Sequence, residues 1–550
     1  MGDKLMSLVR FTGHPLPDAG VATLCAMAGK NSPDELTIED FDVVADELSA
    51  NYFGGIMGSY LSCVFMNSEY VQPEPKDAEG KRKKVQTRKE YETRVLRAHR
   101  WAGDAGAAGL RCAFSQEPAT HLVHRSQIPM LTGEGVLNFF PAGRGMLPIA
   151  GPYLVAIQAL PMGGRRAEGK LLFSHSDDPE LMIELAHLCV NDNRRLLDLG
   201  RVNKLPAIKG PDLSLVREQG ARDQKTKQAK YPDVKAPMSF VASDLSDISL
   251  AKSSAAQAFG SITVYVMSSS GQARPPETVP LEVHAIPSPV VRFFRLVGQP
   301  PTGRTWRALV ARSWRAPQPE KETTEAGNGE NSAVNEDKPT RSKRSPKTQK
   351  SNVPGGAGRS RNDLYSDFFR IFDADFIDTK SAQAFLRRHL FRSGHWRQLV
   401  RSNAPTVFEE ELSLVDWKLA DLFLREVIGM DPRRIEKLRE FADKLATYVA
   451  NSNDKGLFRD LVFAGRSWEV RNALTKAQRN QAKDHGNLLF GLQEYLDVFE
   501  ADGAVGIADW SLTRDLISIR LVESLHSKNF FKEKSDWLES PQSDPSITTA

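Results

Sequence analysis

The sequence contains few cysteines and lacks the common catalytic motifs. Its 550 residues include four cysteines, which lie far apart and form no CxxC pair. This spacing is typical of a reducing compartment rather than of a disulfide framework. We find no GxxxxGK[ST] loop, GxSxG elbow or HExxH motif, and no GxGxxG after a predicted strand. The absence of these motifs excludes the enzyme classes that depend on them, and we expect no cofactor.

The chain also lacks a long apolar run and a large net charge. No apolar stretch reaches the roughly 20 residues of a membrane-spanning helix, and the N-terminal residues have no secretory core. The formal net charge is only +4, so the distribution of charge is more informative than its sum. Hydrophobic residues make up 40% of the chain, which is enough for cores in two or three domains. We expect a soluble, cytoplasmic protein with no membrane partner.

Local patterns predict an α+β fold with a mixed domain over residues 1–315. Thr37-Ile38-Glu39-Asp40 has the form of a capping box and predicts a helix start. Asp178-Pro179 predicts a second helix start, for a helix that continues to Asp198. Residues 170–174, 261–267 and 281–287 are rich in β-branched, aromatic and aliphatic residues and predict strands.

Residues 316–362 predict a disordered basic linker. They contain no aromatic residue, and two valines are their only sizeable aliphatic residues. Such a segment cannot bury enough surface to offset the entropy of ordering. Residues 338–361 within it carry eight basic residues and no acid.

Residues 363–550 predict an all-α helical bundle. Asp431-Pro432 is a typical helix start, followed by apolar residues at helical spacing from Ile435 to Val449. The other side of this helix carries the basic residues Arg433, Arg434, Lys437, Arg439 and Lys444. Further apolar stripes are predicted for Leu488, Leu489, Leu492 and Tyr495, and for residues 516–522.

The strongest local charge bias lies in residues 81–100. Nine of these twenty residues are Lys or Arg and two are acidic. The run is typical either of a solvated helix or of an arm that binds phosphates. In the second interpretation Val95, Leu96 and Trp101 anchor its C-terminal end. The phosphate-binding residues would be Lys81, Arg82, Lys83, Lys84, Arg88, Lys89, Arg94, Arg97 and Arg100.

Cys112 suggests a different class of function. It lies near His121 and His124 in the sequence, so a Cys/His hydrolase is one alternative. A metalloprotein that also uses His175 is another, although the spacings match no zinc-ligand pattern. Packing or surface roles remain a third interpretation of the histidines, and we expect no metal.

Several motifs follow one another in the order found in a known family. The chain resembles the large subunit of type I-B CRISPR Cascade complexes over residues 10–310, and more weakly in the helical tail. The motifs that carry the resemblance are Thr12-Gly13-His14-Pro15, Asp18-Ala19-Gly20, Ala28-Gly29-Lys30, Leu36-Thr37-Ile38-Glu39-Asp40, Ala119, His124-Arg125-Ser126-Gln127-Ile128-Pro129, Asn138-Phe139-Phe140-Pro141, Gln158-Ala159-Leu160-Pro161 and Tyr265 through Gly271-Gln272.

Many members of this family hold zinc with two CxxC pairs. In this sequence the four positions are Cys112, Ser115, Ala150 and Tyr153, so three of the four ligands are replaced. The resemblance therefore implies a degenerate zinc ribbon over residues 111–163 that keeps its turns without the metal.

The resemblance implies a non-catalytic, antiviral or guided-targeting role. Such subunits contact the target-flanking motif, assist opening of the DNA into an R-loop and recruit an effector. The implied partners are the CRISPR guide RNA, double-stranded target DNA with its displaced strand, the backbone, 5′-handle-binding and small Cascade subunits, and a helicase-nuclease or transposition adaptor. In such complexes base pairing reads the target, and side chains read only the flanking motif. Asn138, Arg144 and Gln272 lie near glycines and are residue types that read base edges.

The helical tail resembles the family's small subunit, which lines the DNA strands and in some systems is translated separately. Met430, between Gly429 and Asp431-Pro432, is a candidate internal start. Its product would be residues 430–550, headed by the basic helix that begins at Pro432.

Overall fold

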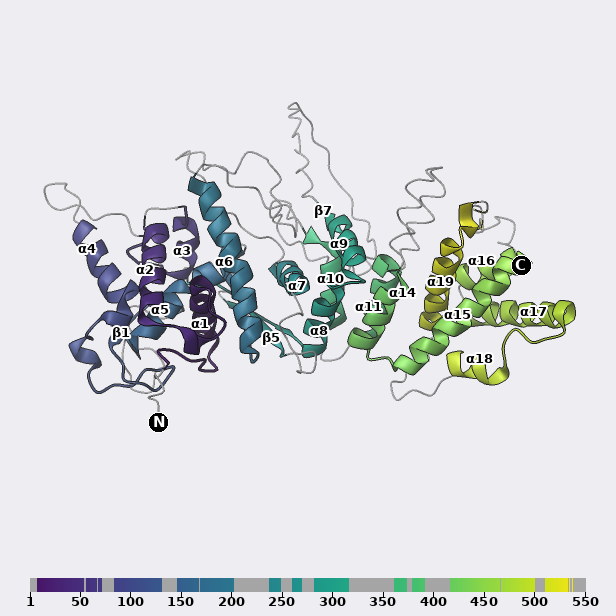
Figure 1. The fold of residues 1–550 in the computed structure, drawn as a ribbon, viewed down its shortest axis with the longest axis horizontal. Helices are drawn as coiled ribbons and strands as arrows, with labels where there is room; N and C mark the ends of the chain where they lie inside the picture. Colours follow the sequence, from purple (N-terminus) through teal and green to yellow (C-terminus); the bar gives the residue numbers. More distant parts are fainter. Residues whose placement is uncertain are drawn as a thin grey trace, which may run out of the picture.

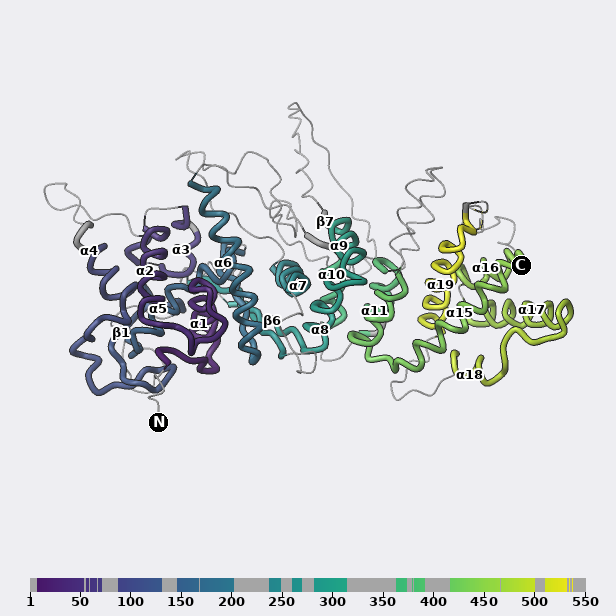
Figure 2. Tube along the Cα trace, viewed as in Figure 1, coloured from purple at the N-terminus to yellow at the C-terminus, as the bar shows by residue number. Residues whose placement is uncertain are grey.

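The protein is elongated, and its helices follow one another along the long axis. The computed structural model describes residues 7–53, 56–66, 68–71, 84–130, 146–167, 169–201, 237–248, 260–269, 281–315, 361–372, 378–390, 416–464, 466–499 and 510–532, together with residues 534 and 537. Figure 1 shows α1–α5 at one end and α15–α19 at the other. The trace in Figure 2 changes colour steadily along this axis, so segments near in sequence are mostly near in space.

The first end of the molecule is built around one buried helix. Helix α1 (Pro15–Ala28) packs against α5 (Gly151–Ala159), where a Cβ on Gly20 would lie 2.4 Å from the Ala156 carbonyl oxygen. Glycine is therefore needed for this close approach. The other elements here are α2 (Ile38–Tyr52), α3 (Gly58–Val64), α4 (Lys84–Tyr91), a π-helical turn (Glu92–Leu96), β1 (His121–Val123) and β2 (Leu147–Ile149).

The predicted capping box at Thr37 is confirmed. The backbone N–H of Asp40 donates to Thr37 Oγ1 at 3.2 Å, and the N–H of Thr37 donates to the Asp40 carboxylate at 2.9 Å. These two bonds satisfy N–H groups that a helix start leaves without partners.

A four-stranded antiparallel sheet separates two hydrophobic cores. Its order is β3 (Arg165–Ala167), β4 (Lys170–Ser176), β5 (Ile262–Met267) and β6 (Leu281–Ile286), which confirms the three predicted strands. Leu171 and Phe173 of β4 belong to the core around α1, whereas Leu172 belongs to the core of the second half. This division follows from the alternation of side chains along a strand. Helix α6 (Pro179–Arg201), also predicted, packs against α1 and β4.

The second core is continuous across the predicted linker. The rings of Phe293 and Phe368 stack with centroids 5.3 Å apart, and Phe423 lies 6.0 Å from Phe293. These rings come from α8 (Ser288–Val297), α10 (Asp363–Phe369) and α14 (Trp417–Phe423). The core also includes α7 (Pro237–Asp247), α9 (Gly303–Arg312) and α11 (Thr379–Phe385). The boundary predicted at residues 316–362 is therefore not a boundary between cores.

The two ends of the predicted linker lie side by side. Strand β7 (Trp314–Arg315) pairs antiparallel with β8 (Arg361–Asn362). The N–H of Asp363 donates to the Ser313 carbonyl at 3.0 Å. Residues 316–360 lie outside the described residues, but their attachment points are adjacent. The chain leaves and re-enters the same core at one place.

The C-terminal region is helical within the residues described. Helices α15 (Pro432–Ser452), α16 (Lys455–Phe463), α17 (Ser467–His485), α18 (Leu492–Phe499) and α19 (Trp510–Ser527) compose it. The prediction for residues 488–495 is wrong in part, because α18 begins only at Leu492 and both Leu488 and Leu492 are exposed. The Gln478 side chain bonds the backbone of Leu489 and Phe490 instead.

Candidate nucleic-acid interface

Several of the predicted site residues lie outside the described residues. These are Lys81, Arg82, Lys83, Asn138, Arg144 and Gln272, and of Lys84 only the helical backbone is described. The remaining basic residues of the 81–100 run lie on α4 and on the turns that follow it. Arg88 and Lys89 are exposed, and the Arg88 guanidinium lies over the Phe53 ring at 4.4 Å while bonding Glu92 at 3.2 Å.

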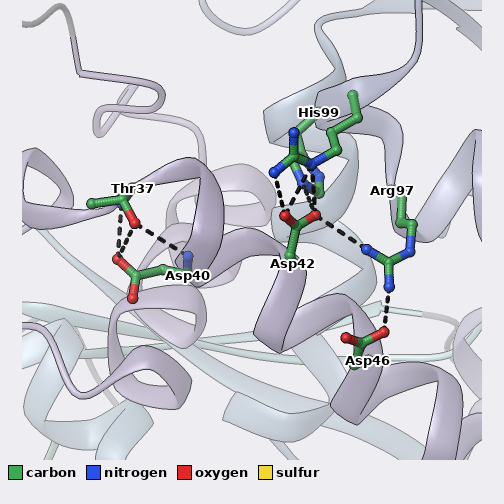
Figure 3. Close-up of polar contacts among 7 residues, drawn as sticks. Thr37, Asp40, Asp42, Asp46, Arg97 and His99 are labelled. Carbon is green, nitrogen blue, oxygen red and sulfur yellow. Dashed lines mark hydrogen bonds and ion pairs between the residues drawn. The ribbon is translucent and has the colours of Figure 1, made fainter.

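The C-terminal half of this basic run is anchored by acids from α2. Asp42 accepts hydrogen bonds from Arg97 at 3.1 Å, from Arg100 at 2.9 Å and from His99 Nε2 at 3.0 Å. Figure 3 shows Asp42 between His99 and Arg97, with Asp46 pairing the other side of Arg97. Val95 and Leu96 of the same run are buried, as predicted.

These contacts fix the protonation states of the cluster. Hydrogen bonding from Arg100 holds the pKa of the Asp42 carboxyl well below its usual range. Burial lowers the pKa of His99, although Asp42 opposes that shift. At neutral pH the two arginine charges therefore face two carboxylates around a neutral imidazole.

Arg94 is paired in a similar way. Its guanidinium bonds the Asp104 carboxylate at 3.0 Å and lies 3.8 Å from Glu90. Arg94, Arg97 and Arg100 are thus partly exposed, but each already has an acidic partner. Of the basic residues whose side chains are described in this run, Lys89 is the one with no ion pair to another described residue.

The predicted basic side of α15 divides into paired and unpaired residues. Lys437 bonds Asp497 and Lys444 bonds Glu494, both at 2.7 Å, and both acids lie on α18. Arg439 pairs with Glu436. We find no ion pair to a described residue for Arg433 or Arg434, and burial lowers the pKa of the Arg434 guanidinium. The head of α15 therefore keeps unneutralised charge.

Met430, the candidate internal start, lies at a break between helices. Gly429 adopts a left-handed conformation with φ of 73°, which ends the preceding π-helical turn (Leu424–Ile428). Asp431 then caps α15 by accepting from the Arg433 N–H at 2.8 Å. The start of residues 430–550 thus coincides with the start of an element.

Sequence reasoning did not single out the outward face of α17. Val470, Ala473, Leu474 and Ala477 are buried on one side of this helix. The opposite side, which we call the α17 face, carries Trp468, Arg471, Asn472, Arg479 and Lys483, at spacings that place them on one side of a helix. Trp468 is 52% exposed. None of the three cations of this face has an ion pair to a described residue.

A signal for the α17 face was present in the sequence. A tryptophan followed by basic residues at positions +3, +11 and +15 has helical periodicity. The composition of residues 467–485 is less basic than that of residues 81–100, so charge density alone did not reveal it.

Within the described residues, Cys112 and the three histidines do not come together as a catalytic or metal-binding set. Cys112 is fully buried, inside a turn in which its N–H donates to the Glu117 carbonyl. His121 Nδ1 contacts Thr120 Oγ1, His124 Nδ1 contacts Ser126, and His175 contacts Asp18. The cysteine and the three histidines therefore have separate partners. Among the described residues, no group of three or more His, Cys, Asp or Glu side chains could hold a metal.

Comparisons with protein-family models, with curated proteins and with solved structures give no match to this chain. Within the part of the chain that the structure describes, no helix has both the length and the hydropathy to cross a membrane.

Proposed function

We propose that this chain is a non-catalytic, nucleic-acid-binding subunit of an RNA-guided surveillance complex, the large subunit of a Cascade of the type I-B kind. The observation that carries nucleic-acid binding is the α17 face, which combines unpaired cations with an exposed indole. Arg and Lys neutralise phosphates, and an exposed aromatic ring stacks on unpaired bases. Both features fit a single strand better than a closed duplex, in which the bases are stacked on one another.

The charge pattern supports separate tasks for the two ends of the molecule. Among the described side chains of this run Lys89 is left for phosphates at one end, because Arg94, Arg97 and Arg100 are held by acids. The proposed phosphate-binding residues Lys81, Arg82, Lys83 and Lys84 have no described side chains. Arg433, Arg434 and the α17 face are left at the other end. Duplex DNA with its flanking motif would lie at the first end and the opened strand at the second. Asn138, Arg144 and Gln272, which lie outside the described residues, remain the proposed base readers.

The degenerate ribbon belongs to the same proposal. The described part of residues 111–163 contains a strand pair, β1 with β2, and a turn around the buried Cys112, which supports this proposal. Packing would hold this turn in place of zinc. The C-terminal helices would act as a small-subunit-like bundle, and the complex would recruit a helicase-nuclease or a transposition adaptor.

The test of the class is copurification from the native host. We expect a tagged full-length chain to bring down a CRISPR guide RNA, identified by RNA sequencing, together with the backbone and 5′-handle-binding subunits. Recovery of the chain without any guide RNA would refute the Cascade assignment.

The test of the α17 face uses purified full-length protein and a fluorescent single strand. Arg479→Glu should weaken binding and lower the salt slope by about 0.7 for each phosphate that is no longer neutralised. Trp468→Ala should weaken binding by about 1–3 kcal/mol if one base stacks on it. Lys528→Glu, which changes the charge of an exposed residue in the turn after α19, is the matched control. Equal effects of the Arg479 and Lys528 variants would contradict a localised site.

A further inference from the structure

A cavity of about 210 Å³ lies between the π-helical turn, β1 and α5. Its apolar wall is formed by Val95, Leu122 and Leu154. Its rim includes Glu90, whose side chain is 60% exposed, so the cavity opens to solvent. π-Helical turns often occur at functional sites, and this one supplies Val95 and Arg94 to the lining.

The lining carries more negative than positive charge. Glu69, Glu90 and Asp104 contribute carboxylates, and Arg94 is the one Lys or Arg among the lining residues. The Asp104 carboxylate already has three donors. It pairs with Arg94 and accepts hydrogen bonds from the Trp101 indole at 3.4 Å and the Leu122 N–H at 3.3 Å. Glu69 has no side-chain hydrogen bond or ion pair to the described residues, and Glu90 has only the 3.8 Å contact with Arg94. The cavity therefore has carboxylate capacity left for a cation.

A buried histidine of the lining is a further polar group that could contact a ligand. His121 lines the cavity and is only 2% exposed, yet its Nε2 has no hydrogen-bond partner among the described residues. Its Nδ1 lies 2.7 Å from Thr120 Oγ1. Burial lowers the pKa of His121, while Asp104 and the backbone of Arg94 oppose that shift, so the ring is neutral at neutral pH. When Nδ1 donates to Thr120, the Nε2 lone pair can accept from an N–H group.

We propose that this cavity binds a small organic cation of the alkylammonium class. The ammonium group donates hydrogen bonds to the carboxylates of Glu69 and Glu90 and to His121 Nε2. The alkyl body packs against Val95, Leu122 and Leu154. This site is separate from the α17 face and does not depend on the proposed nucleic-acid function.

Calorimetric titration of the full-length chain with 1,4-diaminobutane tests the site, and 1,4-butanediol serves as a neutral ligand of equal length. We expect saturable 1:1 binding of the diamine and no heat from the diol. Glu69→Gln with Glu90→Gln should weaken diamine binding at least tenfold. Glu180→Gln with Glu440→Gln removes the same two charges from exposed positions on other helices and should leave the affinity unchanged.

Two results would overturn the proposal. One is equal binding of diamine and diol, because the carboxylates would then have no part in recognition. The other is an equal loss of affinity in the two double variants, which would reveal only a general attraction of cations to an acidic surface. His121→Gln, checked for folding by circular dichroism, should weaken binding several-fold, and an unchanged affinity would remove His121 from the site.

Discussion

Asp42 decides how much of the basic run is available to a partner. One carboxylate accepts hydrogen bonds from Arg97, His99 and Arg100 and so joins α2 to the turns after α4. These three residues lie 55 to 58 positions further along the chain. The charge of the run is thus partly structural, and composition overstates its capacity for phosphates.

We expect acid to loosen this junction in two steps. Burial lowers the pKa of His99, so stability falls as the pH drops below the usual imidazole value of about 6.5. The pKa of Asp42 is lowered by Arg100, so its contribution is present above the usual carboxyl value of about 4 and is lost as the pH falls further. The protection factors of residues 92–100 in hydrogen exchange, which allow for the slower intrinsic exchange in acid, should fall as the pH is lowered from 7 to 3.

Asp42→Asn should cost about 1–3 kcal/mol at pH 7, because a neutral amide offers one oxygen where the carboxylate offers two to Arg97, Arg100 and the buried His99. It should also flatten the acid dependence below about pH 4. Asp34→Asn, at an exposed position without an ion pair to the described residues, is the control for removal of a charge. An unchanged pH profile in Asp42→Asn would show that the cluster contributes nothing to stability.

At the scale of elements, Arg165 connects three of them. Its guanidinium on β3 bonds Asp192 of α6 at 2.7 Å and both oxygens of Asp244 of α7 at 2.8 and 3.2 Å. Burial raises the pKa of Asp244 to about 6, and Arg165 opposes that rise, so the carboxylate is ionised at neutral pH. Such a group is costly to leave without its partner.

Arg165→Met should therefore destabilise the protein by about 3–5 kcal/mol in urea denaturation. The double variant Arg165→Met with Asp244→Leu should recover much of that stability, because it removes the buried charge as well as its partner. A double variant no more stable than the single one would mean that packing, rather than charge, sets the cost.

The elements that sequence predicted well have local signals. The cap at Thr37, the helix after Asp178-Pro179 and strand β5 each depend on residues within a few positions of one another. The pairing of Arg97 with Asp42 depends on tertiary structure, and no periodicity reports it. The exposure of Leu488 was missed for a related reason, since Gln478 of the preceding helix fixes the backbone there. The cavity at His121 was not predicted either, because it forms only where the π-helical turn, β1 and α5 meet in the tertiary structure.

At the scale of the whole molecule, the composition of residues 316–362 predicts a linker between two domains. The hydrophobic core, however, contains residues from both sides of this segment. Composition reports which segments cannot form a core, but not whether the flanking segments share one. Phe293 before the segment and Phe368 after it stack on each other. The mixed and helical parts of the fold were thus predicted as classes, whereas their connection was not.

We expect the chain to remain one particle after a cut in that segment. A protease site placed at residues 330–335 should be cleaved to give two fragments that coelute in size-exclusion chromatography. The shared core around Phe293, Phe368 and Phe423 is the reason. Separation of the fragments without denaturant would contradict it. An intact chain carrying the same insertion serves as the size standard.

The sheet between the cores also constrains how the gene can change. Successive residues of β4 enter different cores, Leu171 and Phe173 one and Leu172 the other. A substitution in β4 alters one core. Insertion or deletion of one residue instead moves every following side chain of the strand to the opposite face of the sheet. Natural variants of this chain should therefore differ in β4 by exchanged residues, while differences in length collect in the connections outside the sheet.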